Sequence, residues 1–261
     1  MRVTSSLFAL VLGVMALGSC GDPKPSGAES EAAPITDRDA VHARVAVLVD
    51  LSETWHNEAS RARNGRLLTL VNEAVATAAE DVNSNPLAFS YYPISANNYF
   101  TDPICSGSYT VSLIPGEEGF FRREDLLEYM NNICVRAALQ LPPQQVTPIA
   151  AAIISAAGSM QDPPGQPRSR KQLIILSDMK EEGGAQPPHA ERDLEGFDII
   201  ILFRALPEDQ VDPTLLQARL QAWQRALEAR GAHVYARPDT GVTSPDLVRT
   251  LRAWTSETTR E

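Results

Sequence analysis

Three short segments, far apart in the chain, carry carboxylate and hydroxyl side chains in a pattern that suits a single site. They are residues 50–54 (DLSET), 147–149 (TPI) and 177–178 (SD). The first and the last each close an apolar, β-branched run, RVAVLVD and QLIILSD, as expected of buried parallel strands. Because α/β folds place their ligand sites at the carboxyl ends of such strands, we expect Asp50 and Asp178 to lie close together there.

The side chains of these segments offer only hard oxygen donors. Carboxylates come from Asp50 and Asp178, and hydroxyls come from Ser52, Thr54 and Thr147. Such a set suits octahedral Mg²⁺, with Mn²⁺ or Ca²⁺ as alternatives, and it suits zinc or copper poorly. Two carboxylates offset the charge of a dication, the hydroxyls are neutral donors, and one octahedral position stays open or holds water. The sequence therefore predicts a divalent-metal site formed by these five residues.

In chain order, these residues resemble the metal-ion-dependent adhesion site of von Willebrand factor A (vWA) domains. Asp50, Ser52 and Thr54 match the DxSxS motif of that family. Thr147 matches its threonine segment, and Asp178 matches its second aspartate. The resemblance covers nearly all of the chain after the N-terminal region and implies a vWA-like, Rossmann-type fold. It also implies a binding module whose metal ion engages a carboxylate on a protein partner.

Two positions depart from the family pattern, and two other functions stay open. Thr54 stands where Ser is commoner but keeps the hydroxyl, whereas Met179 stands where Gly is common, which leaves the conformation of that loop open. In one alternative the protein is a structural envelope lipoprotein with a vestigial, metal-free site, in which Asp50 and Asp178 cap loops. In the other it is a metal-dependent phosphatase resembling the haloacid-dehalogenase-like enzymes. Their DxDxT motif has an aspartate as general acid where this chain has Ser52, which cannot protonate a leaving group near neutral pH.

The sequence contains no other pattern of a catalytic site, and we expect a binding protein rather than an enzyme. It has no glycine-rich phosphate loop and no GxSxG motif, and its four histidines lack metal-ligand spacing. Three glutamates lie next to the segments of the predicted site, Glu53, Glu181 and Glu182. They could tune the charge of the site, although acidic side chains in loops are usually solvated.

The N-terminus has the form of a bacterial lipoprotein signal. Residues 1–19 combine a positive start at Arg2 with an apolar run that is too short to span a membrane. The LGSC sequence that ends at Cys20 resembles a lipobox, which implies cleavage before Cys20 and lipid, such as palmitate, on its sulfur and new amino group. Gly21, in place of Asp, disfavours retention in the inner membrane. We therefore expect a lipid-anchored protein of the bacterial cell envelope, on the periplasmic or surface side of the outer membrane; an ordinary signal peptide cut nearby is the alternative.

The rest of the chain divides by composition into a tether, one folded domain and a short tail. Residues 20–40 are rich in Pro, Gly, Ser, Ala and acids and cannot bury enough apolar surface to fold, so we expect a flexible tether rather than a packed arm. Residues 41–256 are expected to form the domain, and residues 257–261 the tail. The net charge of −10 argues against a nucleic-acid partner. The expected partners are a protein that presents a carboxylate and, through the lipid, the membrane.

Two cysteines remain as a pair if Cys20 is lipidated. Cys105 and Cys134 would form a disulfide in an oxidising compartment. Such a bridge would close a loop of about 30 residues and contribute roughly 3–4 kcal/mol in the chain-entropy model. The alternative is two buried free thiols.

Strand-like and helix-like runs alternate along the domain, which is typical of a parallel sheet wrapped by helices. We expect an α/β, doubly wound fold with a mostly parallel sheet of about six strands and helices on both faces. The expected strands are residues 44–49, 87–94, 109–114 (short and near an edge), 171–177, 197–203 and 233–236. The expected helices are residues 57–82, 124–139, 148–160, 213–230 and 244–255. The third helix is expected to be buried, with Thr147 as its N-cap and Pro148 as its first residue.

Overall fold

The computed structural model describes residues 43–80, 86–95, 102–110, 122–165, 168–181 and 194–253, all within one compact unit. The predicted signal sequence, Cys20, the tether, the tail and Glu182 lie outside these residues. None of the helices in the described ranges is both long and apolar enough to cross a membrane.

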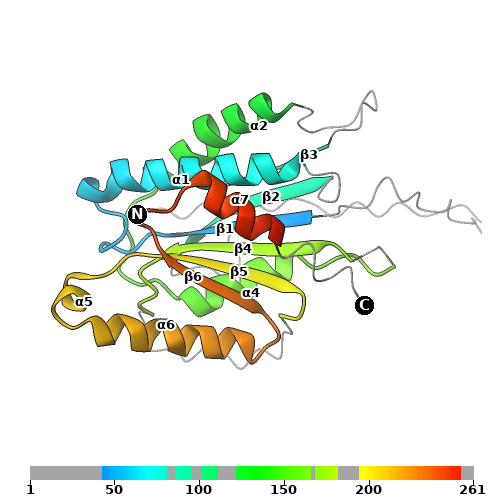
Figure 1. The fold of residues 1–261 in the computed structure, drawn as a ribbon. Helices are drawn as coiled ribbons and strands as arrows, with labels where there is room; N and C mark the ends of the chain where they lie inside the picture. Colours follow the sequence, from blue (N-terminus) through cyan, green and yellow to red (C-terminus); the bar gives the residue numbers. More distant parts are fainter. Residues whose placement is uncertain are drawn as a thin grey trace, which may run out of the picture. The chain divides into compact units, whose positions relative to one another are not determined.

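A six-stranded sheet in the order β3-β2-β1-β4-β5-β6 forms the centre of this unit (Figure 1). Its strands are β1 (Ala43–Asp50), β2 (Leu87–Ile94), β3 (Cys105–Tyr109), β4 (Arg170–Ser177), β5 (Phe197–Phe203) and β6 (His233–Pro238). Neighbouring strands are parallel except β2 and β3, which are antiparallel. The structure therefore confirms the prediction of a doubly wound α/β fold with a mostly parallel sheet.

Helices cover both faces of the sheet (Figure 1). One face carries α1 (Glu58–Ala79), α7 (Ser244–Ala253) and a continuous run of α2 (Arg123–Tyr129), the π-helix η3 (Met130–Val135) and α3 (Arg136–Gln140). The other face carries α4 (Ile149–Ser159) and α6 (Pro213–Glu228), and the short α5 (Pro207–Val211) precedes α6. The central strands are thus covered on both sides.

This double coverage explains why the strands that lead to the predicted site could be recognised in the sequence. Along β1, Val47 and Val49 pack with α1, whereas Ala46 and Leu48 pack on the side of α4. A strand with no solvent-facing side is apolar at every position rather than at alternate ones. The small residues of α4 match this arrangement, because seven of its 11 residues are buried against the sheet and its surroundings.

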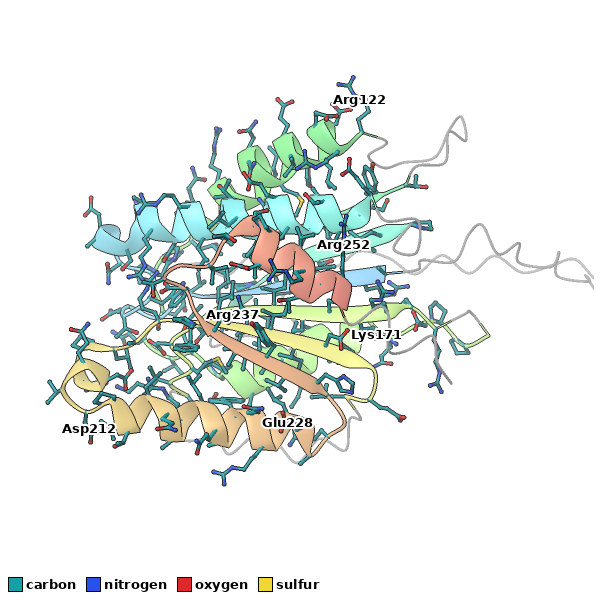
Figure 2. The ribbon with its side chains drawn as sticks, viewed as in Figure 1. Arg122, Lys171, Asp212, Glu228, Arg237 and Arg252 are labelled. Atoms are coloured by element: carbon teal, nitrogen blue, oxygen red, sulfur yellow. A yellow bond between two sulfur atoms is a disulfide. The ribbon has the colours of Figure 1, made fainter. Side chains whose placement is uncertain are left out.

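Helix α6 (Pro213–Glu228) agrees closely with the helix predicted over residues 213–230. Asp212, the N-cap of α6, accepts a hydrogen bond from the backbone of Thr214 at 3.0 Å. Asp212 and Glu228 mark the two ends of this helix in Figure 2. Gly231 follows with a φ of 90°, a left-handed conformation that ends helices and favours glycine.

The third strand differs from the prediction. It covers Cys105–Tyr109 rather than residues 109–114, of which residues 111–114 lie outside the described part of the chain. It is short and lies at an edge of the sheet, as expected, but the segment CSGSY has no apolar run that would reveal it. Cys105 forms a disulfide with Cys134 of η3, with a Cα–Cα distance of 5.4 Å, so the predicted pairing is confirmed.

Candidate metal site

The predicted ligands lie at the carboxyl edge of the sheet, between β1 and β4. Asp50 is the last residue of β1, and Asp178 directly follows β4. The register of the two strands pairs Val49 with Leu176, which places Asp50 beside Ser177. From β1 the strand order continues through β2 on one side and through β4 on the other, so the chain reverses its winding here. Ligands of open α/β sheets bind at such switch points.

A chain of short hydrogen bonds joins four of the five predicted ligands. Ser177 Oγ donates to Asp50 Oδ2 at 2.6 Å, and the backbone N of Ser52 donates to Asp50 Oδ1 at 2.7 Å. Ser52 Oγ and Thr54 Oγ1 are 3.0 Å apart, and Thr54 Oγ1 donates to Asp178 Oδ2 at 2.6 Å. The alternating spacing of the DLSET segment therefore brings the side chains of Asp50, Ser52 and Thr54 together with Asp178.

Thr147, the fifth predicted ligand, is fully buried on a segment that lies against the same loop. The backbone N of Gln144 donates to the C=O of Leu51 at 2.6 Å, and Gln144 and Ser52 form an isolated parallel bridge. The prediction that Thr147 is the N-cap of the next helix is wrong, because α4 begins at Ile149 and Pro148 is its N-cap.

Glu181 accepts a backbone hydrogen bond at the N-terminus of α4, whose N-cap Pro148 has no side-chain acceptor. Its Oε2 accepts a hydrogen bond from the backbone N of Ala150 at 3.2 Å. Burial raises the pKa of the Glu181 carboxyl, while hydrogen bonds from the backbone of Ala150 and Ile149 favour the charged form. This acidic loop residue is therefore half-buried rather than fully solvated, and it caps a helix in the role that the sequence assigned to Thr147.

The two carboxylates of the site are both buried. Asp50 is 0% exposed and Asp178 is 2% exposed, and no ion pair in the described part of the chain includes either residue. Burial and then the charge of Asp178 raise the pKa of Asp50 to about 7, although hydrogen bonds from Ser177 and Ser52 favour its charged form. A bound dication would offset both effects, because its charge favours ionised carboxylates.

The donor set fits a hard cation rather than a soft one. Within the described ranges, no group of three or more His, Cys, Asp or Glu side chains is placed to hold a metal ion. The candidate site differs from such groups because it has two carboxylates, Asp50 and Asp178, and takes its remaining donors from hydroxyls. Side-chain oxygens alone suit Mg²⁺, Mn²⁺ or Ca²⁺.

Met179 adopts the backbone conformation that favours glycine. Its φ is 60°, and among the described residues it is the only non-glycine residue with a positive φ. Its backbone N donates to Ser177 Oγ at 2.8 Å, and its C=O accepts from Trp223 Nε1 at 2.9 Å. The side chain is fully buried, so apolar burial offsets a left-handed cost of about 1–2 kcal/mol. The loop after β4 thus has a glycine-like conformation without a glycine.

Sequence reasoning missed the residues that surround the DLSET loop. Trp55 is 1% exposed, and the guanidinium of Arg204 stacks on its ring. Asn64 is also buried and hydrogen-bonds to both residues. The available signals were the position of Trp55 directly after the motif and that of Arg204 directly after an apolar strand, but neither reveals a contact across about 150 residues of sequence.

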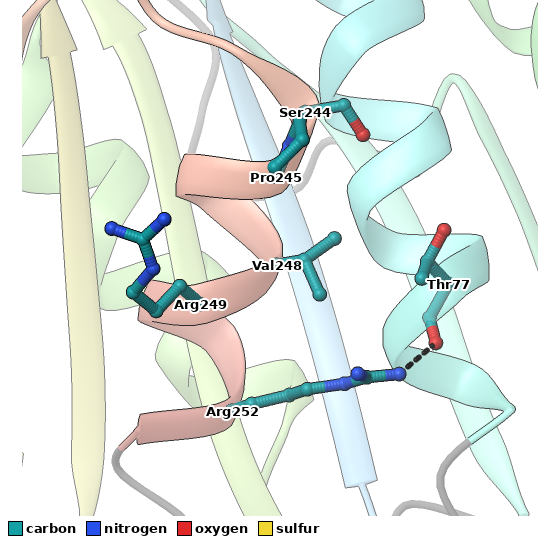
Figure 3. Close-up of a pocket in the computed structure, with 6 residues that line it drawn as sticks. All are labelled: Thr77, Ser244, Pro245, Val248, Arg249 and Arg252. Carbon is teal, nitrogen blue, oxygen red and sulfur yellow. Dashed lines mark hydrogen bonds between the residues drawn. The ribbon is translucent and has the colours of Figure 1, made fainter.

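Two surface grooves lie apart from the candidate ligands. One, of about 580 Å³, lies between α1 and α7 and is lined by Thr77, Ser244, Pro245, Val248, Arg249 and Arg252. Within it Arg252 reaches across to α1 and donates to the C=O of Thr77 at 3.0 Å (Figure 3). The other, of about 820 Å³, lies between α1 and α3 and includes Leu70 and Leu139. Neither groove is lined by a predicted ligand.

No protein-family model matches this chain, and no curated protein matches its sequence. Similar solved structures include a von Willebrand factor type A protein from Catenulispora acidiphila, with 14% identity and a TM-score of 0.43 over 83% of this chain and 42% of that one. BatB from Bacteroides thetaiotaomicron, a conserved hypothetical protein, has 10% identity and a TM-score of 0.45 over 82% of this chain and 99% of that one. The manganese-loaded TRAP protein of Plasmodium vivax has 10% identity and a TM-score of 0.43 over 82% of this chain and 73% of that one. This chain spans less than half the length of the first of these proteins, and its fold is assigned from its own strand order and helix layers.

Proposed function

We propose that this protein is a membrane-tethered binding module that uses a divalent ion, Mg²⁺ or alternatively Mn²⁺ or Ca²⁺, to engage a carboxylate on a protein partner. The observation that carries this proposal is the hydrogen-bonded chain from Asp50 through Ser52 and Thr54 to Asp178 at the switch point of the sheet. When bound, the ion supplies a positive charge that attracts an acidic group from outside.

The side chains of the site favour binding of a cation and a partner carboxylate in two ways. Asp50 and Asp178 are buried close enough together to raise the pKa of Asp50, so a cation relieves their repulsion. Ser52, Thr54 and Thr147 offer neutral oxygens, so they add no negative charge that would repel the carboxylate of a partner. The resemblance of these residues to the vWA adhesion site supports a binding role, and the left-handed Met179 keeps the glycine-like loop of that pattern.

The membrane tether is the second part of the proposal and is based on the N-terminal sequence. Residues 1–19, Cys20 and the acidic, proline-containing residues 21–40 have the order of a signal, a lipidated cysteine and a spacer. We propose that lipid on Cys20 holds the domain at the bacterial envelope, on the outer membrane. Replacing Cys20 with Ser should release the protein from the membrane fraction, and unchanged fractionation would contradict the anchor.

Capture experiments test the binding function. The immobilised domain is incubated with a solubilised envelope fraction in Mg²⁺ or in a chelator, next to Asp50→Ala and Glu53→Gln. Glu53 is the matched control, because it lies in the same loop but is exposed and takes no part in the hydrogen-bonded chain. We expect partner capture by the wild type and Glu53→Gln in Mg²⁺ only, and none by Asp50→Ala. Capture that persists in the chelator and in Asp50→Ala would contradict a metal-dependent function and favour a vestigial site.

A further inference from the structure

Trp55 fixes the turn that presents two of the predicted ligands. It directly follows Thr54, and its side chain is buried in the core beside α1. Its backbone N donates to the C=O of Ser52 at 3.1 Å and lies 3.3 Å from Ser52 Oγ. Its C=O accepts a hydrogen bond from Asn64 Nδ2 of α1 at 2.8 Å. A shift of Trp55 would therefore move Ser52 and Thr54 with it.

Arg204, the first residue after β5, holds Trp55 in this position. Its guanidinium carbon lies 4.1 Å from the centroid of the Trp55 ring. The guanidinium donates to Asn64 Oδ1 at 2.7 Å and to Asp239 Oδ2 at 2.9 Å, and one of its nitrogens lies 3.5 Å from the C=O of Trp55. The side chains of Arg204 and Asp239 are 11% and 2% exposed, so these contacts are largely shielded from water. Arginine has a planar guanidinium that can stack on a ring and donate hydrogen bonds in several directions, whereas lysine has no such group.

We propose that Arg204 is a positioning residue for the metal site: by stacking on Trp55 and joining Asn64 to Asp239, it holds the β1–α1 loop in the conformation that binds the ion. This inference rests on the proposed function, because it concerns the same site. Among the described residues, the hydrogen bonds and the ion pair of Arg204 go to Asn64, Trp55 and Asp239 and not to a predicted ligand, so its effect on metal binding passes through Trp55.

The sign of the effect separates positioning from simple electrostatics. Burial lowers the pKa of Arg204, and the negative charges of Asp239 and Asp178 act in the opposite direction, so the guanidinium lies within electrostatic reach of the site. If charge alone mattered, replacing Arg204 with an uncharged residue would remove a positive charge that repels the dication, and metal binding would become tighter. If positioning dominates, removing it loosens the loop and weakens metal binding.

The test measures the dissociation constant for Mn²⁺ alone on the full chain, from the electron paramagnetic resonance signal of the free ion. Arg204→Met keeps the length of the side chain, and Arg204→Lys keeps the charge, but both lose the planar fork. Arg63→Met is the matched control, because Arg63 also pairs with Asp239 but has no stacking contact with Trp55. We expect both Arg204 variants to raise the dissociation constant about tenfold or more, because changes in the groups that hold metal ligands in place typically cost about tenfold or more in affinity. Arg63→Met should stay within about twofold of the wild type.

The remaining outcomes separate this inference from the proposed function. Near-ultraviolet circular dichroism without metal shows whether each variant folds. Asn64→Ser replaces any Arg204 variant that does not fold: it keeps the stack but breaks the link between Asn64 and Arg204, and it should also raise the dissociation constant for Mn²⁺. Unchanged or tighter Mn²⁺ binding by the Arg204 variants overturns the inference and leaves the metal site intact. An equal loss in Arg63→Met also overturns it, because the effect would then belong to Asp239. No Mn²⁺ binding by the wild type overturns both proposals.

Discussion

Replacing Asp50 with Asn is expected to stabilise the metal-free domain at pH 8. Burial and the nearby Asp178 raise the pKa of Asp50 from 3.8 to about 7. A carboxyl group whose pKa is higher in the folded state destabilises the fold when it ionises. This cost is absent below about pH 4, grows between about pH 4 and pH 7, and is complete above that window. At about 1.4 kcal/mol per pH unit, the full cost is about 4 kcal/mol.

The Asn side chain has nearly the same shape and carries no charge at any pH. Its oxygen can accept from the backbone of Ser52, but its NH₂ group then faces Ser177 Oγ, which donates to Asp50 in the wild type. Disturbing that hydrogen bond costs about 1 kcal/mol. We therefore expect Asp50→Asn to be more stable than the wild type by about 3 kcal/mol at pH 8 and less stable by about 1 kcal/mol at pH 4.

Urea unfolding of both proteins between pH 4 and pH 8, in the presence of a chelator, measures this difference. The other titrating groups are common to both chains, so the difference between the two free energies of unfolding reports the ionisation of Asp50 together with its coupling to Asp178. A difference that does not change with pH would refute the reasoning, because Asp50 would then have the same pKa in the folded and unfolded states.

Three further predictions concern residues outside the ligand set. Burial raises the pKa of Asp198 to about 6, although His233 opposes the rise, so wild-type stability should fall relative to Asp198→Asn as the pH rises from about 4 to 6; parallel curves in urea unfolding would contradict this. At Met179 the left-handed backbone should make Met179→Gly more stable than Met179→Ala by about 1 kcal/mol, the reverse of the usual order, and thermal unfolding of the two variants decides it. Replacing Cys105 and Cys134 together with Ala should lower the free energy of unfolding by roughly 3–4 kcal/mol, and a loss under about 1 kcal/mol would show that the bridge constrains the unfolded chain little.

The sequence predicted the parts of the fold whose signal is local. The runs that became β1, β4 and β5 are apolar at successive positions because helices cover both faces, and this pattern needs no knowledge of the partner strands. Strand β3 was misplaced because CSGSY is an edge segment without an apolar run. Its order comes from pairing with β2 and from the disulfide of Cys105 with Cys134, 29 residues further along the chain.

The same distinction applies to the site. Asp50, Ser52, Thr54 and Asp178 could be brought together in advance, because strand ends and an alternating spacing dictate where their side chains lie. The helix cap was assigned to Thr147 by local rules, whereas Glu181 reaches the helix from another loop. The stack of Arg204 on Trp55 was not predictable for the same reason, since two loops meet there only once the sheet has formed.

Thermal unfolding of the domain in increasing Mg²⁺ tests the central claim most directly. The measurement compares the wild type with Asp50→Ala and with the exposed-loop control Glu53→Gln. At a Mg²⁺ concentration of about 100 times the dissociation constant, mass action should add about 2.7 kcal/mol and raise the unfolding temperature of the wild type and Glu53→Gln by roughly 5–10 °C. Asp50→Ala should show no shift. Equal behaviour of the wild type and Asp50→Ala, with or without a shift, would contradict a metal site at the carboxyl ends of β1 and β4.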